Sequence, residues 1–210
     1  MKIVQASAEI LQATPGALLL IELAARNCYK SEGLAKGTEE AAGEFIRRKI
    51  LHGDDPHLSV LEHAHVTVRF VVDRGVSHQL VRHRHTAISQ ESTRYCNYGK
   101  EKFGKEITVV EPCFFKAETP SWYRWREACE DAERAYFKLL SEGHAPEEAR
   151  TVLPMSLKTE IVLTANFASW RHMFRARTDR RAHPQMREVM VPLEQQFTKL
   201  FPAVFTCVRS

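Results

Sequence analysis

His65-Val66-Thr67-Val68-Arg69-Phe70-Val71-Val72 is the stretch of the sequence that decides its fold. Apolar side chains occupy every even position, and three of the four odd positions are polar. This period of two predicts a β-strand with one buried face. A strand of this kind needs partner strands and a cover for its apolar face, so the chain around it is expected to supply both.

Other segments of the chain carry weaker but readable signals. Thr14 is expected to cap the first helix, with Pro15 at its first helical position, and Thr38 to cap the second. Pro192 is expected to kink or divide the last helical segment. Strands are expected over residues 2–13, 107–110 and 157–165, which are rich in β-compatible and apolar residues. Helices are expected over residues 17–29, from 39 onward, and over 76–83, 120–143, 145–150, 166–179 and 186–200.

Composition places these elements in one globular chain. The 210 residues are 44% hydrophobic and 27% charged, which is enough to bury a core, and no repeat or linker divides them. We therefore predict a single α/β (α+β) domain over residues 1–210. The formal net charge of +4 is mild and favours an anionic small molecule over a bulk polyanion.

Compartment follows from what the sequence lacks. Its five cysteines are odd in number and contain no C-x-x-C, which argues against a disulfide framework or a cysteine zinc site. The N-terminus has no signal-peptide pattern, and no apolar run is long enough to cross a membrane. A cytoplasmic protein with free thiols and no membrane partner is the expectation.

The segment from Arg82 to Tyr95 is the candidate site. It gathers three arginines, two histidines, two serines, a glutamine and a glutamate around a short apolar island. Such a composition suits the binding of an anion better than the building of a core. A helix over 76–83 would place Gln79, Arg82 and His83 on one side and deliver the rest of the segment as a loop.

Three kinds of chemistry can be weighed for this segment. His63-x-His65 and His83-x-His85 each resemble half of a metal site, but the arginines beside the second pair disfavour a cation, and no metal is expected. A serine hydrolase is disfavoured because no G-x-S-x-G is present. Phosphate binding fits better: forked arginines and the Ser92 hydroxyl suit a nucleotide, although neither a P-loop nor a Rossmann fingerprint occurs.

The same segment resembles a family signature. Arg82-His83-Arg84, followed by seven residues, Ser92 and Arg94, is similar to the R-H-R motif of the flavin-dependent thymidylate synthases. Further matches follow in order at 57–63, at Gln79, at 150–154 and at 166–177, so the resemblance extends from about residue 57 to 187.

The resemblance implies an enzyme that reductively methylates dUMP to dTMP. FAD would be its cofactor, with methylenetetrahydrofolate as carbon donor and NADPH as reductant. It also implies an α/β fold with a central, largely antiparallel sheet flanked by helices. A homotetramer whose active sites combine residues from several chains is implied as well.

The resemblance assigns roles by position. Those implied as catalytic are Arg177, Ser92 and His57. Those implied to contact the flavin are Ser59, Arg82, His83, Arg84, Gln90, Asn166 and His172. Those implied to contact dUMP are Gln79, Arg82, Gln90, Ser92, Arg94, Arg150 and Arg177. Arg177 would place a fixed cation near O4 and N3 of the pyrimidine, where negative charge builds as C5 becomes nucleophilic.

Some assignments stay open. Ser92 is either a nucleophile or a ligand of the phosphate and ribose, and the absence of an evident base favours the ligand role. Ala168 and Arg181 depart from residues that members of the family often carry, an arginine and a histidine, at the flavin site. The alternative function is a basic protein that binds single-stranded nucleic acid through its arginines, Trp122, Trp125 and Tyr95, without enzymatic activity.

Overall fold

The structure is a computed structural model that describes residues 1–52 and 56–206. Its backbone contacts group into two compact units. Unit 1 comprises residues 1–7, 70–82 and 89–161, and unit 2 comprises residues 8–69, 83–88 and 162 onward. Within the described residues, no helix has the length and apolar character needed to cross a membrane.

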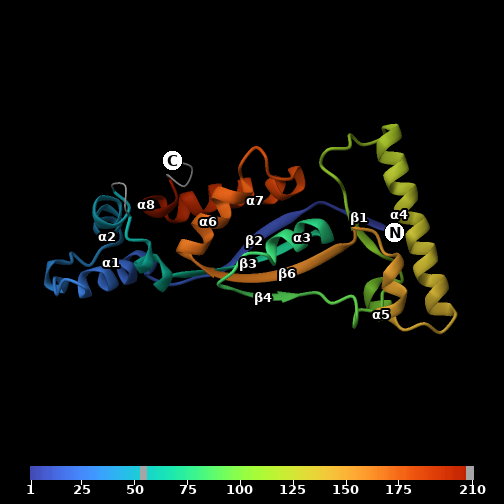
Figure 1. The fold of residues 1–210 in the computed structure, drawn as a ribbon, viewed down its shortest axis with the longest axis horizontal. Coiled ribbons are helices and arrows are strands. Elements are labelled where there is room, and N and C mark those ends of the chain that lie inside the picture. The colour runs from blue at the N-terminus through green and yellow to red at the C-terminus, as the bar shows by residue number, and fades with distance from the viewer. Residues whose placement is uncertain (53–55, 207–210) are drawn as a thin grey trace. The chain divides into compact units, whose positions relative to one another are not determined.

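Four strands form the main sheet in the order β2-β3-β6-β4 (Figure 1). Their bounds are Ser7–Ala13 for β2, His65–Asp73 for β3, Lys158–Asn166 for β6 and Thr86–Gln90 for β4. The strands are antiparallel, as expected. β3 confirms the strand predicted over residues 65–72, because its even-numbered apolar side chains are fully buried.

Two predictions about strands were wrong. Residues 2–13 form two strands, β1 (Lys2–Val4) and β2, because β1 pairs in parallel with β5 (Thr108–Val110) in a separate two-stranded sheet. The strand must therefore break between the segment that pairs with β5 and the segment that pairs with β3. Residues 86–90, expected as part of a loop, form β4, an edge strand of the four-stranded sheet.

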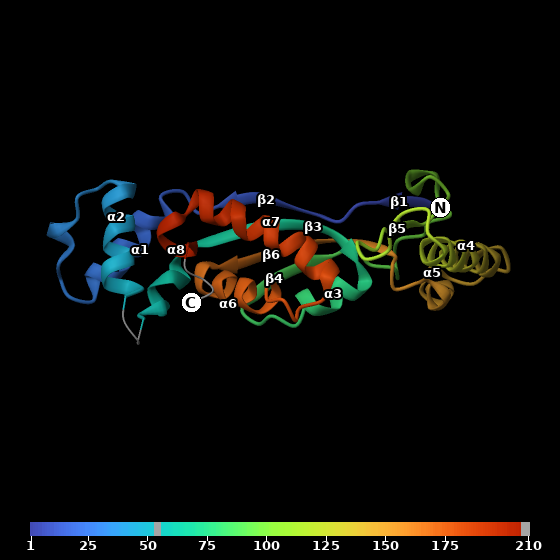
Figure 2. The same cartoon turned by 90° about the horizontal axis from the view of Figure 1, so that it is seen from above.

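The helices of unit 2 are built around an aromatic core. α6 and α7 lie side by side (Figures 1 and 2), and Trp170 and Phe174 of α6 contact Phe197 of α7 at ring-centroid distances of 5.0 Å. Phe205 joins the same cluster 5.1 Å from Phe197. The helices are α1 (Ala17–Asn27), α2 (Glu39–Phe45), α6 (Phe167–Arg177), α7 (Pro184–Leu200) and α8 (Pro202–Phe205), with a π-helical turn η2 (Ile46–Ile50) and 3₁₀ turns η1 (Glu32–Leu34) and η3 (Leu58–His63).

The expected helix caps are partly correct. Thr38 caps α2, since its Oγ1 accepts a hydrogen bond from the Ala41 amide at 3.3 Å. Thr14 does not cap α1, which begins after Gly16 in a left-handed conformation. The Thr14 hydroxyl instead accepts a hydrogen bond from the His65 amide at 2.9 Å. Pro192 does not divide α7, which continues from Pro184 to Leu200 and carries Pro192 on its exposed side.

Unit 1 packs the long helix α4 (Pro120–Ser141) on a small core. Tyr136 and Cys129 of α4 are buried with Ile107 and Val109, and Trp125 packs against them. The prediction that the aromatic side of this helix belongs to a core is therefore confirmed. The remaining elements are α3 (Arg74–Leu80), α5 (Pro146–Ala149), η4 (Glu101–Phe103) and η5 (Arg150–Val152).

Candidate functional site

The R-H-R motif directly follows α3. The Asp73 carboxylate caps this helix by accepting a hydrogen bond from the Val76 amide at 2.6 Å, and the helix ends at Leu80. Arg82 and Arg84 are exposed, and neither forms an ion pair within the described part of the chain. Two exposed cations without carboxylate partners suit the binding of an anion.

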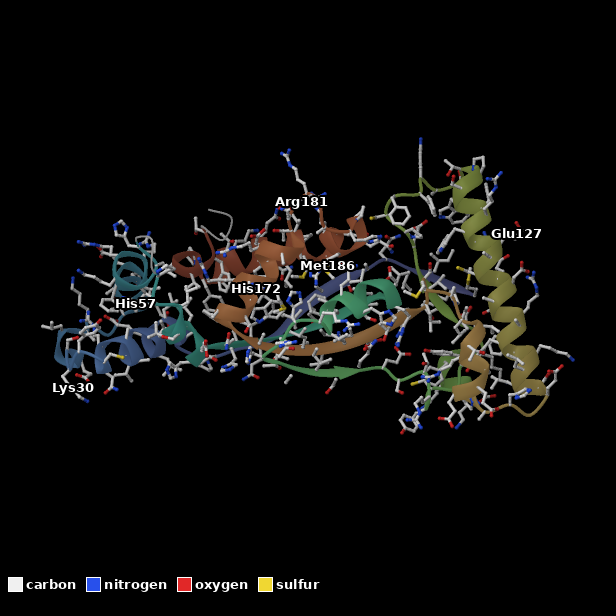
Figure 3. The ribbon with its side chains drawn as sticks, viewed as in Figure 1. Lys30, His57, Glu127, His172, Arg181 and Met186 are labelled. Atoms are coloured by element: carbon white, nitrogen blue, oxygen red, sulfur yellow. The ribbon has the colours of Figure 1, made fainter. Side chains whose placement is uncertain are left out.

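In unit 2, His83, His172 and Arg177 form a group that we call the imidazole–guanidinium group. Arg177 is the last residue of α6, and its Nε donates a hydrogen bond to Nε2 of His83 at 3.0 Å. The rings of His83 and His172 meet edge to face with centroids 5.9 Å apart. Figure 3 labels His172 on α6.

The electrostatics of this group keep His83 neutral. Burial, the Arg177 guanidinium and His172 together lower the pKa of His83 to about 4. A neutral imidazole whose Nε2 accepts a hydrogen bond carries its proton on Nδ1. Burial also lowers the pKa of Arg177, which remains charged because an arginine begins from so high a value.

Unit 2 also holds Asn166, His57 and Ser59, which are expected near the flavin, and Arg181, where the sequence departs from the family. Asn166 caps α6, because its Oδ1 accepts a hydrogen bond from the Ser169 amide at 2.8 Å. His57, labelled in Figure 3, is exposed just before η3, and Ser59 is exposed within that turn. Arg181, also labelled there, is 93% exposed and pairs with Asp179 at 3.0 Å.

In unit 1, the structure brings together several residues expected at dUMP. Arg94 and Arg150 both bind Glu147: the Arg94 Nε donates to its carboxylate at 2.9 Å and the Arg150 Nε to its carbonyl at 3.2 Å. Arg150 also donates to the Thr93 hydroxyl at 3.2 Å, and the Ser92 hydroxyl accepts a hydrogen bond from the Arg94 amide at 3.3 Å. We call these five residues the arginine group.

Gln90 lies on β4 with its amide nitrogen already engaged. Its Nε2 donates to the hydroxyls of Ser77 and Thr159, each at 3.2 Å. Arg74 donates to the same Thr159 hydroxyl at 3.4 Å. Gln79, the other glutamine expected at dUMP, is half-buried on α3.

Glu91 ties the end of β4 to its surroundings. Its carboxylate accepts hydrogen bonds from the Tyr98 hydroxyl at 3.0 Å and from the Lys158 ammonium at 2.9 Å. The Glu91 amide donates to the Glu160 carbonyl at 2.9 Å. The Lys158 and Glu91 side chains are only 18% and 13% exposed, so this ion pair is well shielded from water.

Sequence reasoning missed Glu147, Thr93, Glu91 and Lys158. Glu147 lies three residues before Arg150 in a short helical segment, and that spacing was the one local signal available. Arg94 and Glu147 are 53 residues apart, so no local pattern could have joined them. Among residues 1–52 and 56–206, no three His, Cys, Asp or Glu side chains are grouped as metal ligands would be.

Known proteins match this chain over most of its length. The family described as thymidylate synthase complementing protein matches residues 9–203. Flavin-dependent thymidylate synthases of Mycobacterium bovis (strain BCG / Pasteur 1173P2) and Mycobacterium tuberculosis (strain ATCC 25177 / H37Ra) are each 31% identical over 206 residues, covering 90% of this chain and 79% of theirs.

A third relative, the flavin-dependent thymidylate synthase of Mycobacterium sp. (strain KMS), is 30% identical over 210 residues with the same coverage of both chains. The family match runs through nearly the whole described chain and includes both the arginine group and the imidazole–guanidinium group. This chain belongs to the thymidylate synthase complementing protein family.

Proposed function

We propose that the protein is a flavin-dependent thymidylate synthase that converts dUMP to dTMP. The observation that carries the proposal is the family match over residues 9–203, within which the motif Arg82-His83-Arg84, Ser92 and Arg94 is intact. We further propose FAD as cofactor, methylenetetrahydrofolate as carbon donor and NADPH as reductant. Because the match runs through both compact units, we propose that residues 1–210 act as one synthase domain.

The side chains of the motif fit a flavin nucleotide. A pyrophosphate needs cations that are not already neutralised, and Arg82 and Arg84 meet this need within the described chain. A flavin ring needs polar partners at its edge, which neutral His83 and the amide nitrogen of Asn166 can provide. Ser59, Gln90 and His172 are proposed as further flavin contacts, and His57 as a residue near the reacting edge. Bound flavin would supply the hydride, and NADPH would reduce it.

The arginine group supports the binding of the dUMP phosphate. Arg94 and Arg150 offer two guanidinium groups of which only Arg94 pairs with a carboxylate, that of Glu147, while Arg150 bonds to the Glu147 backbone carbonyl and the Thr93 hydroxyl. The Ser92 hydroxyl bonds to the backbone amide of Arg94. Both arginines are exposed, so an incoming phosphate can compete with Glu147 for their nitrogens. Gln79, Arg82 and Gln90 are proposed to complete the nucleotide site.

Arg177 is proposed to meet the pyrimidine, either within one chain or across chains of a homotetramer. A guanidinium held in place near O4 and N3 would stabilise the negative charge that develops as C5 attacks the methylene carbon. Its partial burial supports this role, because a charge acts more strongly where water is excluded.

The alternative of a nucleic-acid-binding protein is not favoured. Its stacking platform would need Trp122 and Trp125, but the Trp125 indole donates to Ser156 at 2.8 Å and packs on the core of unit 1. The Trp122 indole donates to the Glu111 carboxylate at 2.6 Å. Of these three aromatic residues only Tyr95 is exposed, at 77%, and the Arg94 guanidinium lies over its ring at 5.5 Å.

Purified protein provides the test of this function. It should be yellow, it should oxidise NADPH in a manner that responds to dUMP, and it should form dTMP when methylenetetrahydrofolate is added. The Arg177→Ala variant should retain flavin and lose dTMP formation, because the proposed pyrimidine contact is removed. A colourless protein that cannot take up FAD would overturn the proposed function, and near wild-type turnover in Arg177→Ala would overturn the role of Arg177.

A further inference from the structure

The hydrogen bond between Arg177 and His83 gives the histidine of the motif a distinct task. We propose that His83 is a positioning residue that fixes the orientation of the Arg177 guanidinium by accepting a hydrogen bond from its Nε. The inference rests on the proposed function, in which Arg177 meets the pyrimidine. It differs from the role implied by the sequence resemblance, which made His83 only a flavin contact.

The geometry explains how a single hydrogen bond from Arg177 to His83 can orient the guanidinium. Arg177 is the last residue of α6, so its long side chain leaves the end of a helix and has many rotamers open to it. A guanidinium is planar and rigid, and a bond to Nε along a defined direction fixes both the plane and the placement of the terminal nitrogens. A guanidinium stabilises a developing negative charge most effectively when it is already oriented before the reaction.

The histidine is itself held in place. The Thr86 hydroxyl donates to the His83 carbonyl at 3.0 Å, which anchors the backbone at the start of β4. The His172 ring meets the imidazole at an interplanar angle of 75°, which limits its rotation. The imidazole is therefore fixed at its backbone, at its ring and at Nε2.

The bond also requires one particular form of the imidazole. Nε2 can accept only when it carries no proton, so the working form is the neutral ring with its proton on Nδ1. Burial and the neighbouring Arg177 and His172 all oppose a second proton on this ring. Burial, Arg177 and His172 thus keep His83 in the neutral form that can accept the hydrogen bond.

Three variants separate positioning from direct contact with flavin. His83→Phe keeps a ring and removes the acceptor, whereas His83→Gln keeps an acceptor at the end of a side chain of similar reach. His85→Asn is the matched control, because His85 lies two residues away, is exposed, and has a φ of 57° that asparagine tolerates. Each variant is to be measured for bound flavin, for KM of dUMP and for kcat of dTMP formation.

We expect His83→Phe to lower kcat per bound flavin about 100-fold, whatever flavin is lost with the polar contact of the ring. His83→Gln should recover most of this loss, and His85→Asn should behave as wild type. In an Arg177→Lys background, which has no guanidinium plane for His83 to orient, His83→Phe should cause little further loss. The proposal is overturned if the decreases in kcat of His83→Phe and Arg177→Lys multiply in the double variant. It is also overturned if His83→Phe loses flavin but has a normal kcat per bound flavin.

A second measurement is independent of synthase activity. Long-range proton–nitrogen NMR of the histidine side chains, on the full chain without flavin or dUMP, should show His83 with a bare Nε2 and a protonated Nδ1. Arg177→Lys should change the Nε2 signal, whereas His85→Asn should not. A proton on Nε2 would overturn the positioning role even in an active enzyme. An inactive wild type with the expected tautomer would instead refute the proposed function alone.

Discussion

Ser92 sits among binding groups rather than beside a base. Its Oγ accepts a hydrogen bond from the Arg94 amide, and within the described residues no His, Asp or Glu side chain bonds to it. A serine nucleophile needs a neighbouring base to take its proton. The contacts therefore favour the ligand role over the nucleophile that the motif also allowed.

Replacing Ser92 by alanine should accordingly raise KM for dUMP and leave a measurable kcat. The reason is that one phosphate or ribose contact is lost while the reacting groups stay in place. Steady-state assays with dUMP as the varied substrate measure this split. Ser141→Ala, at an exposed position on α4, is the control for loss of a hydroxyl. Loss of all chemistry with dUMP binding intact would instead identify Ser92 as the nucleophile.

Because His83 is neutral in the folded chain, the free energy of unfolding should depend on pH. The pKa of His83 is about 4 in the folded chain against an ordinary value of 6.5, so the unfolded chain binds the extra proton between these values. The free energy of unfolding contributed by this group is fully present above pH 6.5 and falls as the pH drops toward 4. Urea unfolding at pH 7 and pH 5 should show a smaller loss in His83→Gln than in the wild type, and equal losses would contradict the assignment.

At the scale of elements, β4 links the two groups of candidate site residues, and side-chain hydrogen bonds hold the chain at both of its ends. Thr86 is bonded to the His83 carbonyl at one end, and Glu91 is bonded to Lys158 and Tyr98 just past the other. Ser92 follows Glu91 directly, so the place of the serine depends on that shielded ion pair. Burial lowers the pKa of Lys158, but its hydrogen bonds to Glu91 and Glu160 and the charges of these two carboxylates raise it, so that the pKa lies above its ordinary value.

Glu91→Gln should therefore lower the free energy of unfolding by about 1–3 kcal/mol and raise KM for dUMP, because Lys158 loses a charged partner in a place with little water. Denaturant titrations and dUMP kinetics measure the two effects. Glu101→Gln, which removes an exposed partner of Lys105, should change stability by less than about 0.5 kcal/mol. Equal effects from the two variants would show that the Glu91 pair is not a special anchor.

Elements with strong local patterns were predictable. The strand expected over 65–72 appears as His65–Asp73, and the helix expected over 120–143 appears as Pro120–Ser141, because alternation and helical spacing are local properties. β4 was missed because Thr86–Gln90 is short, polar in part and at a sheet edge, where pairing rather than pattern makes the strand. The break after Val4 was missed because it depends on two distant partners.

The candidate site was predictable to the extent that a motif carries it. The ordered matches pointed to Arg94, Arg150, His83 and Arg177, and the structure joins them as two pairs through contacts that the sequence does not contain. Glu147 links the first two, and a direct hydrogen bond links the last two. Which flavin and dUMP contacts each residue makes stays a prediction.

At the scale of the whole molecule, the proposed homotetramer makes a specific demand. If each active site takes Arg94 from one chain and Arg177 from another, two inactive variants can restore one another. Co-expressed Arg94→Ala and Arg177→Ala chains should form mixed tetramers with dTMP formation well above either variant alone, since some sites would receive both arginines. Light scattering should report four times the mass of one chain. Mixed tetramers without recovered activity would mean that both arginines come from one chain.

The backbone conformation of His85 restricts which residues can replace it. Its backbone adopts a φ of 57°, a conformation that β-branched residues resist and that glycine, asparagine and aspartate enter at little cost. The position lies between the Arg82–Arg84 motif and β4, so a strained residue there would disturb the hydrogen bond of Thr86 to the His83 carbonyl at the start of the strand. In a saturation library selected for growth without thymidine, position 85 should accept those three small residues and reject valine and isoleucine, whatever the chemistry of the side chain.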